Sequence, residues 1–154
     1  MTILQKFFKL SFNNKILFIE ALWYLGFYRL LVLIFPFRKT ARLLGEENTE
    51  TPVSDEGVDI TTAKRISTAV RVMSRHTFWE SKCLVQAYAA KRMLRRRKQK
   101  ATVYLGVSKN EQGNMIAHAW LRCGTIFVTG GNGQIKFSVT SRFSDVSKSE
   151  RTTV

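Results

Sequence analysis

One cysteine and one histidine in this sequence are placed so that a thiol and an imidazole could act together. Cys83 stands at the predicted start of a helix, in the stretch WESKCLVQAYAAKRMLRRR. The first turn of a helix has free backbone N–H groups and partial positive charge, which stabilise a thiolate and a developing oxyanion. His118 lies in the middle of MIAHAWLRC, whose pattern predicts a strand. The two residues are the smallest set for a thiolate nucleophile with an imidazole base.

Two starts of that helix are compatible with the residues, and they place Cys83 differently. If Ser81 is the N-cap, Cys83 lies in the first turn. If Thr77 and Glu80 form a capping box, the helix begins earlier and the Cys83 N–H lies inside the hydrogen-bond ladder. Both alternatives stay open, as does the structural one, because apolar cysteines and half-buried histidines are common in protein cores.

Other side chains near these blocks are weaker candidates. Strand alternation places Trp120 on the same face as His118, and Trp79 precedes the first cysteine, so both rings are candidate walls of a substrate cleft. His76 is expected in an interhelix loop and ranks below the strand histidine as a base. Cys123 ends a strand beside a turn, which favours a structural role.

The elements that must position these residues begin with an apolar N-terminal segment. Residues 16–35 have the length of a membrane span, but they carry Glu20 and Arg29, whose charges are costly in hydrocarbon. We therefore expect residues 1–37 to form helices that pack on the domain or on a partner protein, in preference to a membrane. Next, FRKTARLLG predicts a short basic helix that Gly45 ends.

A polar stretch and then two helices and three strands follow. EENTETPVSDEG predicts a surface linker, and Asp59 is the expected cap of a helix that ends near Arg75. The helix of the first cysteine runs from about Ser81 to Lys98. ATVYLGVSK, MIAHAWLRC and TIFVTGG predict an antiparallel meander, and SRFSDVSKSERTTV predicts a frayed tail. The fold class is α+β, with a predicted boundary after residue 58.

The composition restricts the partners and the metal chemistry. Twenty-five Lys and Arg residues against 11 Asp and Glu give a formal net charge of +14, which favours nucleic acid, an anionic membrane surface or an acidic peptide. No nucleic-acid motif is visible, and the aromatic residues are not interleaved with the basic ones. Two cysteines without Cys/His ligand spacing predict neither a disulfide framework nor a zinc site, and they fit a reducing cytoplasm.

The blocks WESKCLVQAYAAKRMLRRR, VYLGVSK and AHAWLRCG resemble the Cys and His blocks of the transglutaminase-like cysteine peptidases that remove the leader in lasso peptide biosynthesis. The similarity covers roughly residues 60–131, and the apolar N-terminus that ends in FPFRKTARLLG is also similar. It implies a transglutaminase/papain-like catalytic core at residues 59–154, after an N-terminal helical segment and linker at residues 1–58. Cys83 would be the nucleophile, and His118 the base and later the acid.

The third catalytic group is where the sequence departs from that family. Its members often carry an acidic residue on the strand after the histidine, but this sequence has TIFVTGGNGQ there. A hairpin turn at Cys123 and Gly124 is expected to place Thr129 opposite His118, with Asn132 a little further on. The Asn132 amide, a backbone carbonyl and no third group at all remain open alternatives.

The resemblance implies hydrolysis of one peptide bond in a ribosomally made precursor, without a cofactor or a metal. Its implied partners are the precursor's leader peptide, a separate small leader-binding protein and, as a further candidate, the lasso cyclase. The run RRRKQK is either a solvated helix end or a dock for acidic residues. The alternative function is a non-catalytic basic module that binds nucleic acid or an anionic membrane surface.

Overall fold

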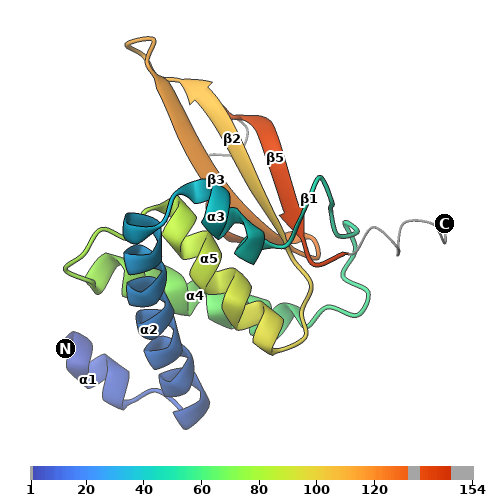
Figure 1. The fold of residues 1–154 in the computed structure, drawn as a ribbon. Coiled ribbons are helices and arrows are strands. Elements are labelled where there is room, and N and C mark those ends of the chain that lie inside the picture. Colours follow the sequence, from blue (N-terminus) through green and yellow to red (C-terminus); the bar gives the residue numbers. More distant parts are fainter. Residues whose placement is uncertain (1, 132–135, 147–154) are drawn as a thin grey trace.

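The computed structural model describes residues 2–131 and 136–146, which form helical layers on one side of an antiparallel sheet (Figure 1). The helical elements are α1 (Ile3–Phe8), α2 (Phe12–Ile34), α3 (Phe37–Thr40), the 3-10 helix η1 (Ala41–Leu44), α4 (Ile60–His76) and α5 (Cys83–Arg96). The strands are β1 (Glu46–Glu47), β2 (Thr102–Lys109), β3 (Met115–Cys123), β4 (Ile126–Thr129) and β5 (Ser138–Ser144). The architecture is α+β, as the sequence predicts.

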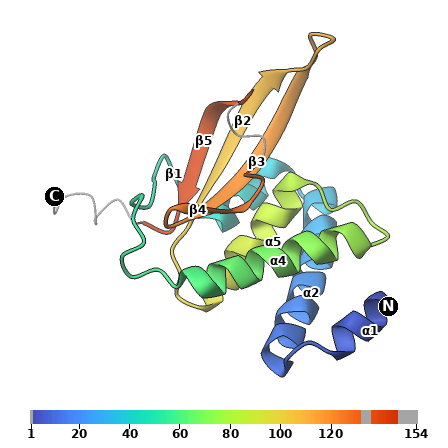
Figure 2. The ribbon, with the colours of Figure 1, turned by 180° about the vertical axis from the view of Figure 1, so that it is seen from behind.

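Helix α5 is the centre of the fold because other elements cover it on several sides. It packs against α2, α4 and the strands β3 and β4, and the view from behind shows α4 lying beside β4 (Figure 2). The buried residues of α5 include Val85, Ala87, Tyr88, Ala89, Ala90, Met93 and Leu94. The alanines let neighbouring elements approach closely, so the helix that begins with Cys83 is held in a fixed position.

Helix α2 packs one face on α4 and α5 and leaves the opposite face exposed. Leu17, Ala21 and Leu25 recur every four residues and are buried, which is the inner stripe of an amphipathic helix. Glu20 is also buried, and its carboxylate lies 2.7 Å from the guanidinium of Arg97, so its charge has a partner inside the fold. By length and composition, α2 is the one described helix that is apolar enough to cross a membrane.

The predicted meander is present at one side of a larger sheet. The strand order is β1-β5-β2-β3-β4, and every pair is antiparallel. β2 and β3 pair from Thr102 with Arg122 to Lys109 with Met115. The hairpin that joins these two strands projects beyond the helices (Figure 1).

The prediction of a frayed tail from Ser141 onward is wrong for the described part of that stretch. β5 pairs with both β1 and β2, and Phe143 is only 4% exposed. Asp145 then forms an ion pair with the buried Lys91 of α5 at 2.9 Å. A strand rich in Ser and Thr alternates weakly, so long-range pairing fixes its place more than its own pattern does. Residues 147–154 lie outside the described residues.

The stretch EENTETPVSDEG is a surface linker only in its second half. Its first two residues form β1, and Thr49 and Thr51 are buried against the sheet. The hydroxyl of Thr51 forms a hydrogen bond of 2.8 Å with that of Thr102 on β2. Residues 53–57 are exposed, as predicted. The division of the chain after residue 58 stays a prediction.

Candidate active site

Cys83 lies in the first turn of α5, as the Ser81 alternative predicts, although the N-cap is one residue later than that alternative places it. The helix begins at Cys83 itself, with Lys82 as N-cap in an extended conformation. Thr77 is instead the C-cap of α4, and Glu80 forms an ion pair with Lys82, so the capping box is absent here. Ser81 is not the cap. The Lys82 side chain has no oxygen that could accept from the first-turn N–H groups, so no N-cap side chain occupies these donors at the positive end of α5.

The structure brings Cys83 and His118 together as side chains that line one pocket of about 270 Å³. The thiol comes from the first residue of α5 and the imidazole from the middle of β3. The other lining residues are Phe37, Leu84, Leu105, Gly106, Val107, Ala117, Ala119 and Thr140. Apolar side chains form most of this wall, and the pocket is shallow and open, so a substrate can reach the thiol and the imidazole from the surface.

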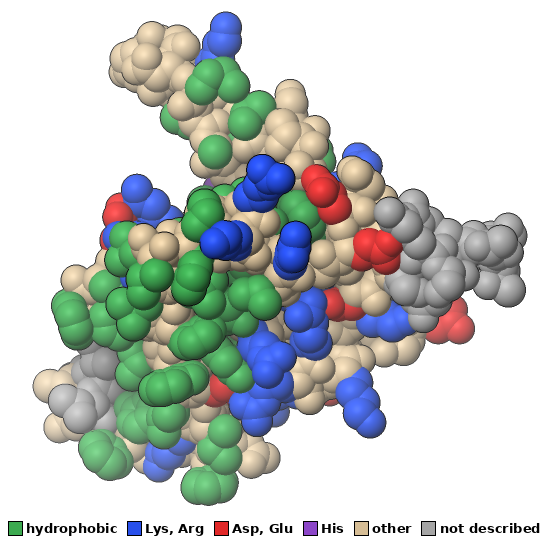
Figure 3. Space-filling view, viewed as in Figure 1, with side chains coloured by type: hydrophobic (Ala, Val, Ile, Leu, Met, Phe, Trp, Pro, Cys, Tyr) green, Lys and Arg blue, Asp and Glu red, His purple; other side chains and the backbone are tan. Residues whose placement is uncertain are grey.

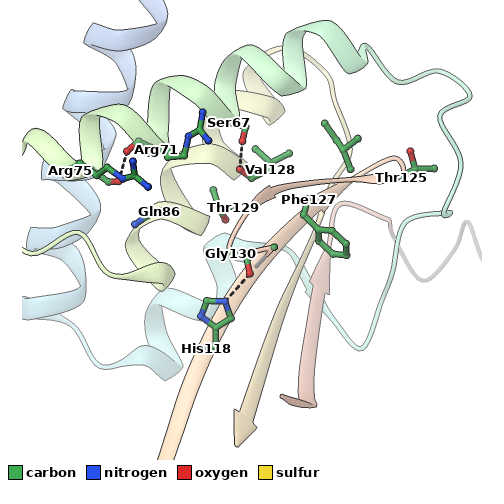
Figure 4. A pocket seen from close by; sticks show the side chains of 13 residues that line it. Ser67, Arg71, Arg75, Gln86, His118, Thr125, Phe127, Val128, Thr129 and Gly130 are labelled. Carbon is green, nitrogen blue, oxygen red and sulfur yellow. Dashed lines mark hydrogen bonds between the residues drawn. The ribbon is translucent and has the colours of Figure 1, made fainter. Parts of the chain in front are cut away.

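A backbone carbonyl is the group that holds the imidazole of His118. Its Nε2 lies 2.8 Å from the carbonyl oxygen of Gly130 (Figure 4). A carbonyl only accepts hydrogen bonds, so Nε2 carries the hydrogen and Nδ1 of the neutral ring keeps its lone pair. The ring also stacks on Trp120 at 5.8 Å between centroids and contacts Phe137 at 5.0 Å. These contacts fix both the tautomer and the plane of the imidazole.

The expected position of Thr129 opposite His118 is wrong. Thr129 pairs with Leu121. The hairpin turns at Gly124 and Thr125, one residue later than expected, which moves Thr129 two positions along β3, and a register shift between Leu121 and Arg122 adds one more position. This irregularity leaves the next residue, Gly130, to present its carbonyl to the imidazole. Asn132, the predicted amide partner, lies outside the described residues.

The backbone of Gly130 adopts a conformation that side chains disfavour. Its φ is +69°, and a Cβ atom at this position would lie 2.4 Å from the carbonyl oxygen of Ala119 and 2.9 Å from the Cβ of Trp120. Only glycine fits without moving the strand. Side-chain chemistry offered no signal for this residue, although the Gly-Gly pair in TIFVTGG indicated a special backbone.

The two tryptophans have different surroundings. Trp120 is buried and stacks on Tyr104 and on His118, and Gly106 makes room for it, since a Cβ there would lie 2.8 Å from the indole ring. Trp79 packs against Gly26 of α2 and lines a different, apolar pocket. Trp120 therefore borders the imidazole, whereas Trp79 does not line the pocket of the thiol and the imidazole.

The remaining cysteine and histidine lie away from this pocket. Cys123 is buried, and burial raises the pKa of its thiol to about 11, as suits a structural residue. His76 is the last residue of α4 instead of a loop residue, and its Nδ1 lies 2.7 Å from the carbonyl oxygen of Val72. Neither side chain lines the pocket with Cys83.

Most of the arginines in the basic run at the end of α5 have acidic partners within the chain. Arg95 pairs with Asp145 at 2.7 Å, and Arg96 and Arg97 both contact the carboxylate of Glu20. These pairs attach α5 to β5 and to α2. The run is thus neither a purely solvated helix end nor a free row of cations.

A second pocket, of about 780 Å³ and with several polar side chains, is also lined by His118 (Figure 4). It is lined by Ser67, Arg71, Ser74, Arg75, Gln86, His118 and residues 125–131. Sequence reasoning missed Gln86, although a spacing of three residues on a helix puts it on the face of Cys83. Its amide donates to the carbonyl of Ser81 at 2.8 Å, which braces the loop before the nucleophile.

Metal ligation has no support in the part of the chain that the structure describes. No group of three or more His, Cys, Asp or Glu side chains there could hold a metal ion. The arrangement of a thiol at a helix start, an anchored imidazole and open N–H donors instead suits nucleophilic attack on a carbonyl carbon.

Comparison with known proteins agrees with this chemistry. Residues 21–142 match the family described as the transglutaminase-like superfamily, and the match includes Cys83, His118 and Gly130. No curated protein and no solved structure matches the chain. The superfamily typically includes cysteine proteases, and the helices with their small antiparallel sheet are consistent with its fold. The chain therefore belongs to the transglutaminase-like superfamily.

Proposed function

We propose that this protein is a cysteine peptidase that cleaves the leader peptide from a ribosomally synthesised lasso peptide precursor. The observation that carries the proposal is the single pocket lined by Cys83 and His118, in which the carbonyl of Gly130 anchors the imidazole. The likeness of the Cys and His blocks to leader peptidases supplies the substrate class. The proposed setting is the cytoplasm, where free thiols stay reduced.

The geometry leads to a mechanism in two steps. Nδ1 of His118 takes the thiol proton, and the thiolate of Cys83 attacks the scissile carbonyl carbon. The open N–H groups at the start of α5 stabilise the oxyanion of the tetrahedral intermediate. Nδ1–H then protonates the leaving amine as the C–N bond breaks. Water, deprotonated by the same nitrogen, attacks the thioester and releases the acid and the free thiol.

A neutral third group has a kinetic consequence. The carbonyl of Gly130 orients the imidazole as a carboxylate would, but it carries no charge that would stabilise the imidazolium. We therefore expect slow turnover, which is tolerable for an enzyme that meets one precursor. Because the carbonyl already orients the ring, Asn132→Ala should cost at most about tenfold in kcat/KM, as measured by mass spectrometry of precursor cleavage. Complete loss of cleavage in that variant would instead make the amide essential.

We propose that the separate leader-binding protein docks on the exposed face of α2. Hydrophobic side chains gather over this helix (Figure 3), and Trp23 and Leu30 are 70% and 61% exposed. An apolar groove of about 750 Å³ runs between α2 and residues 78–80, where Phe78 is 96% exposed. These residues lead directly into the start of α5, so a partner in the groove would hold the leader next to the nucleophile. The lasso cyclase would then take the released core peptide.

The docking face can be tested apart from the chemistry. Trp23→Glu with Leu30→Glu should weaken capture of the leader-binding protein and slow cleavage of the full precursor, while a short peptide spanning the junction is still cut. Met115→Glu, which changes an exposed residue at the far end of the β2–β3 hairpin, is the matched control. Equal cleavage of the full precursor by all variants would remove α2 from the proposal, and extraction only with detergent would favour a membrane surface.

The function itself is tested by incubating the purified protein with a candidate precursor and leader-binding protein and reading the products by mass. One cut between leader and core is the expected result. Cys83→Ala should abolish it and keep the fold, because alanine is the best helix former and is smaller than cysteine. Cleavage that survives in purified Cys83→Ala protein would overturn the mechanism.

A further inference from the structure

The polar pocket beside His118 has no part in the bond-breaking steps described above. It lies between α4 and the end of β4, and His118 is the one residue that it shares with the pocket of Cys83. The two pockets differ in character. The thiol pocket is small and mostly apolar, whereas this one is about 780 Å³ and combines hydroxyl, amide and guanidinium groups with the apolar side chains of residues 126–128. A peptide bound at the thiol has this space next to it.

Two arginines give the polar pocket a positive charge that no described acid neutralises. Arg71 and Arg75 are one turn apart on α4 and both line the pocket (Figure 4). Neither guanidinium forms an ion pair with a described residue, in contrast to the arginines at the end of α5. No Asp or Glu is among the described lining residues. Like charges four residues apart on a helix repel each other, so an anion between them would remove an unfavourable interaction.

A buried hydroxyl in the same pocket has no hydrogen-bond partner among the described residues. Thr129 is 7% exposed, and its Oγ1 is unpaired. The neighbouring hydroxyl of Ser67 already donates to the carbonyl of Val128 at 2.7 Å. The Thr129 oxygen atom is itself buried, so a ligand in the open pocket does not reach it. The pocket thus offers its ligand two guanidinium groups.

We propose that this pocket binds a carboxylate of the substrate on the carboxyl side of the bond that is cut. The forked N–H donors of arginine match the two oxygens of a carboxylate. The side of the bond follows from the mechanism, on which this inference rests. His118 protonates the leaving amine, so the chain that follows the scissile bond passes the imidazole and enters the space beyond it. An acidic side chain or a free terminal carboxylate in that space pairs with the guanidinium groups of Arg71 and Arg75.

Binding to a protein that cannot cut tests the pocket directly. Cys83→Ala protein is titrated with fluorescein-labelled junction peptides that carry Asp, Asn or Lys at each of the first positions after the cut, all with amidated ends. At one position Asp should bind about tenfold tighter than Asn, and Lys weaker still. The same peptides with Asn and a free terminal carboxylate show whether the terminus is the ligand instead. A preference in either arm supports a carboxylate site.

Arginine variants show whether the preference belongs to this pocket. Arg71→Gln with Arg75→Gln should abolish the preference, and Arg71→Glu with Arg75→Glu should reverse it in favour of Lys. Lys64→Gln with Arg92→Gln is the control, since it removes the same charge from exposed residues that line no pocket with His118. Equal affinities for the Asp, Asn, Lys and free-acid peptides would overturn the proposal. So would a preference that is lost equally in the Arg71→Gln, Arg75→Gln variant and in the Lys64→Gln, Arg92→Gln control.

Cleavage by the protein with Cys83 intact separates this inference from the proposed function. If junction peptides are cut but the Arg71 and Arg75 variants slow acidic and neutral peptides equally, the carboxylate site is wrong and the peptidase stands. If acidic peptides bind with the expected preference but no peptide is cut under any condition, the peptidase proposal fails and the position of the carboxylate relative to a cut fails with it.

Discussion

Replacing Gly130 by alanine should damage the site through the backbone alone. The residue has φ +69°, where a residue with a side chain is disfavoured by about 1–2 kcal/mol. Its new Cβ would also lie 2.4 Å from the carbonyl oxygen of Ala119, whereas real Cβ atoms essentially never come closer than 3.0 Å. The chain must therefore shift by roughly half an ångström, against backbone that cannot rotate away. The carbonyl that holds Nε2 of His118 moves with it.

We expect Gly130→Ala to lose more activity than backbone strain alone would cause, because the imidazole also loses its hydrogen-bond acceptor. Without its anchor the neutral imidazole populates both tautomers, and only one has Nδ1 free to take the thiol proton. We expect kcat/KM for precursor cleavage to fall tenfold to a hundredfold, or about 1.4–2.8 kcal/mol in the barrier. Gly113→Ala is the matched control. It has φ +79° and no atom within 4 Å of where the new methyl group would lie, so it carries the strain of a positive φ without the clash.

A tautomer measurement decides between this reasoning and simple instability. Nitrogen-15 spectra of the imidazole should show mainly the Nε2–H form in the original protein and in Gly113→Ala, and a mixture in Gly130→Ala. Urea denaturation should show both alanine variants destabilised, Gly130→Ala more so. If Gly130→Ala keeps both the Nε2–H form and the original cleavage rate, the carbonyl is not what orients His118.

Three further outcomes follow from the same structure. Iodoacetamide at neutral pH should alkylate the partly exposed Cys83 far faster than Cys123, which is buried and whose pKa is raised to about 11; equal rates would contradict a reactive nucleophile at Cys83. His118→Ala should lower kcat/KM by roughly a hundredfold or more, and a smaller loss would mean that another group moves the proton. Burial raises the pKa of Asp145, but the charges of Lys91 and Arg95 outweigh this effect and hold the pKa below the usual 3.8. The ionised carboxylate therefore stabilises the fold above pH 3.8, and this stabilisation is lost as the pH falls through the pKa that Asp145 has in the folded protein. Asp145→Asn should remove this part of the acid dependence in urea denaturation and, by leaving the Lys91 charge unpaired, cost about 3–5 kcal/mol near pH 7.

The elements with strong local signals were predictable from the sequence. Asp59 caps α4 as expected, with its carboxylate accepting the N–H of Thr62 at 2.9 Å, and β2, β3 and β4 form the predicted meander. Cys83 and His118 were selected as candidates from residue type, predicted position and the resemblance of their sequence blocks to a cysteine peptidase family, and their catalytic roles stay predictions. Their placement in one pocket required only that the helix pack on the strands, which its buried alanine-rich face favours.

What the sequence could not supply depends on long-range pairing or on backbone geometry. β5 is held by its partners on either side, so its Ser-rich residues carry little signal of their own. The hairpin turns one residue later than predicted, and the shift between Leu121 and Arg122 adds a further offset, so Thr129 does not face His118; alternation assumes a regular ladder and shows neither effect. A backbone carbonyl was among the predicted alternatives for the third group, but the sequence could not say which one, because every residue has a carbonyl and only the conformation of Gly130 sets it apart.

The position of α2 in the chain determines the order in which its surfaces become covered during synthesis. Its inner face packs on α4 and α5, and α5 ends roughly 60 residues after α2 does. At about 5–20 residues per second, a ribosome needs several seconds to make that stretch. Until α4 and then α5 are complete, part of the inner face of this 23-residue apolar helix is uncovered, and Glu20 has yet to meet Arg97. The growing chain is therefore most exposed to chaperones, to membranes and to aggregation before α5, which begins with Cys83, is complete.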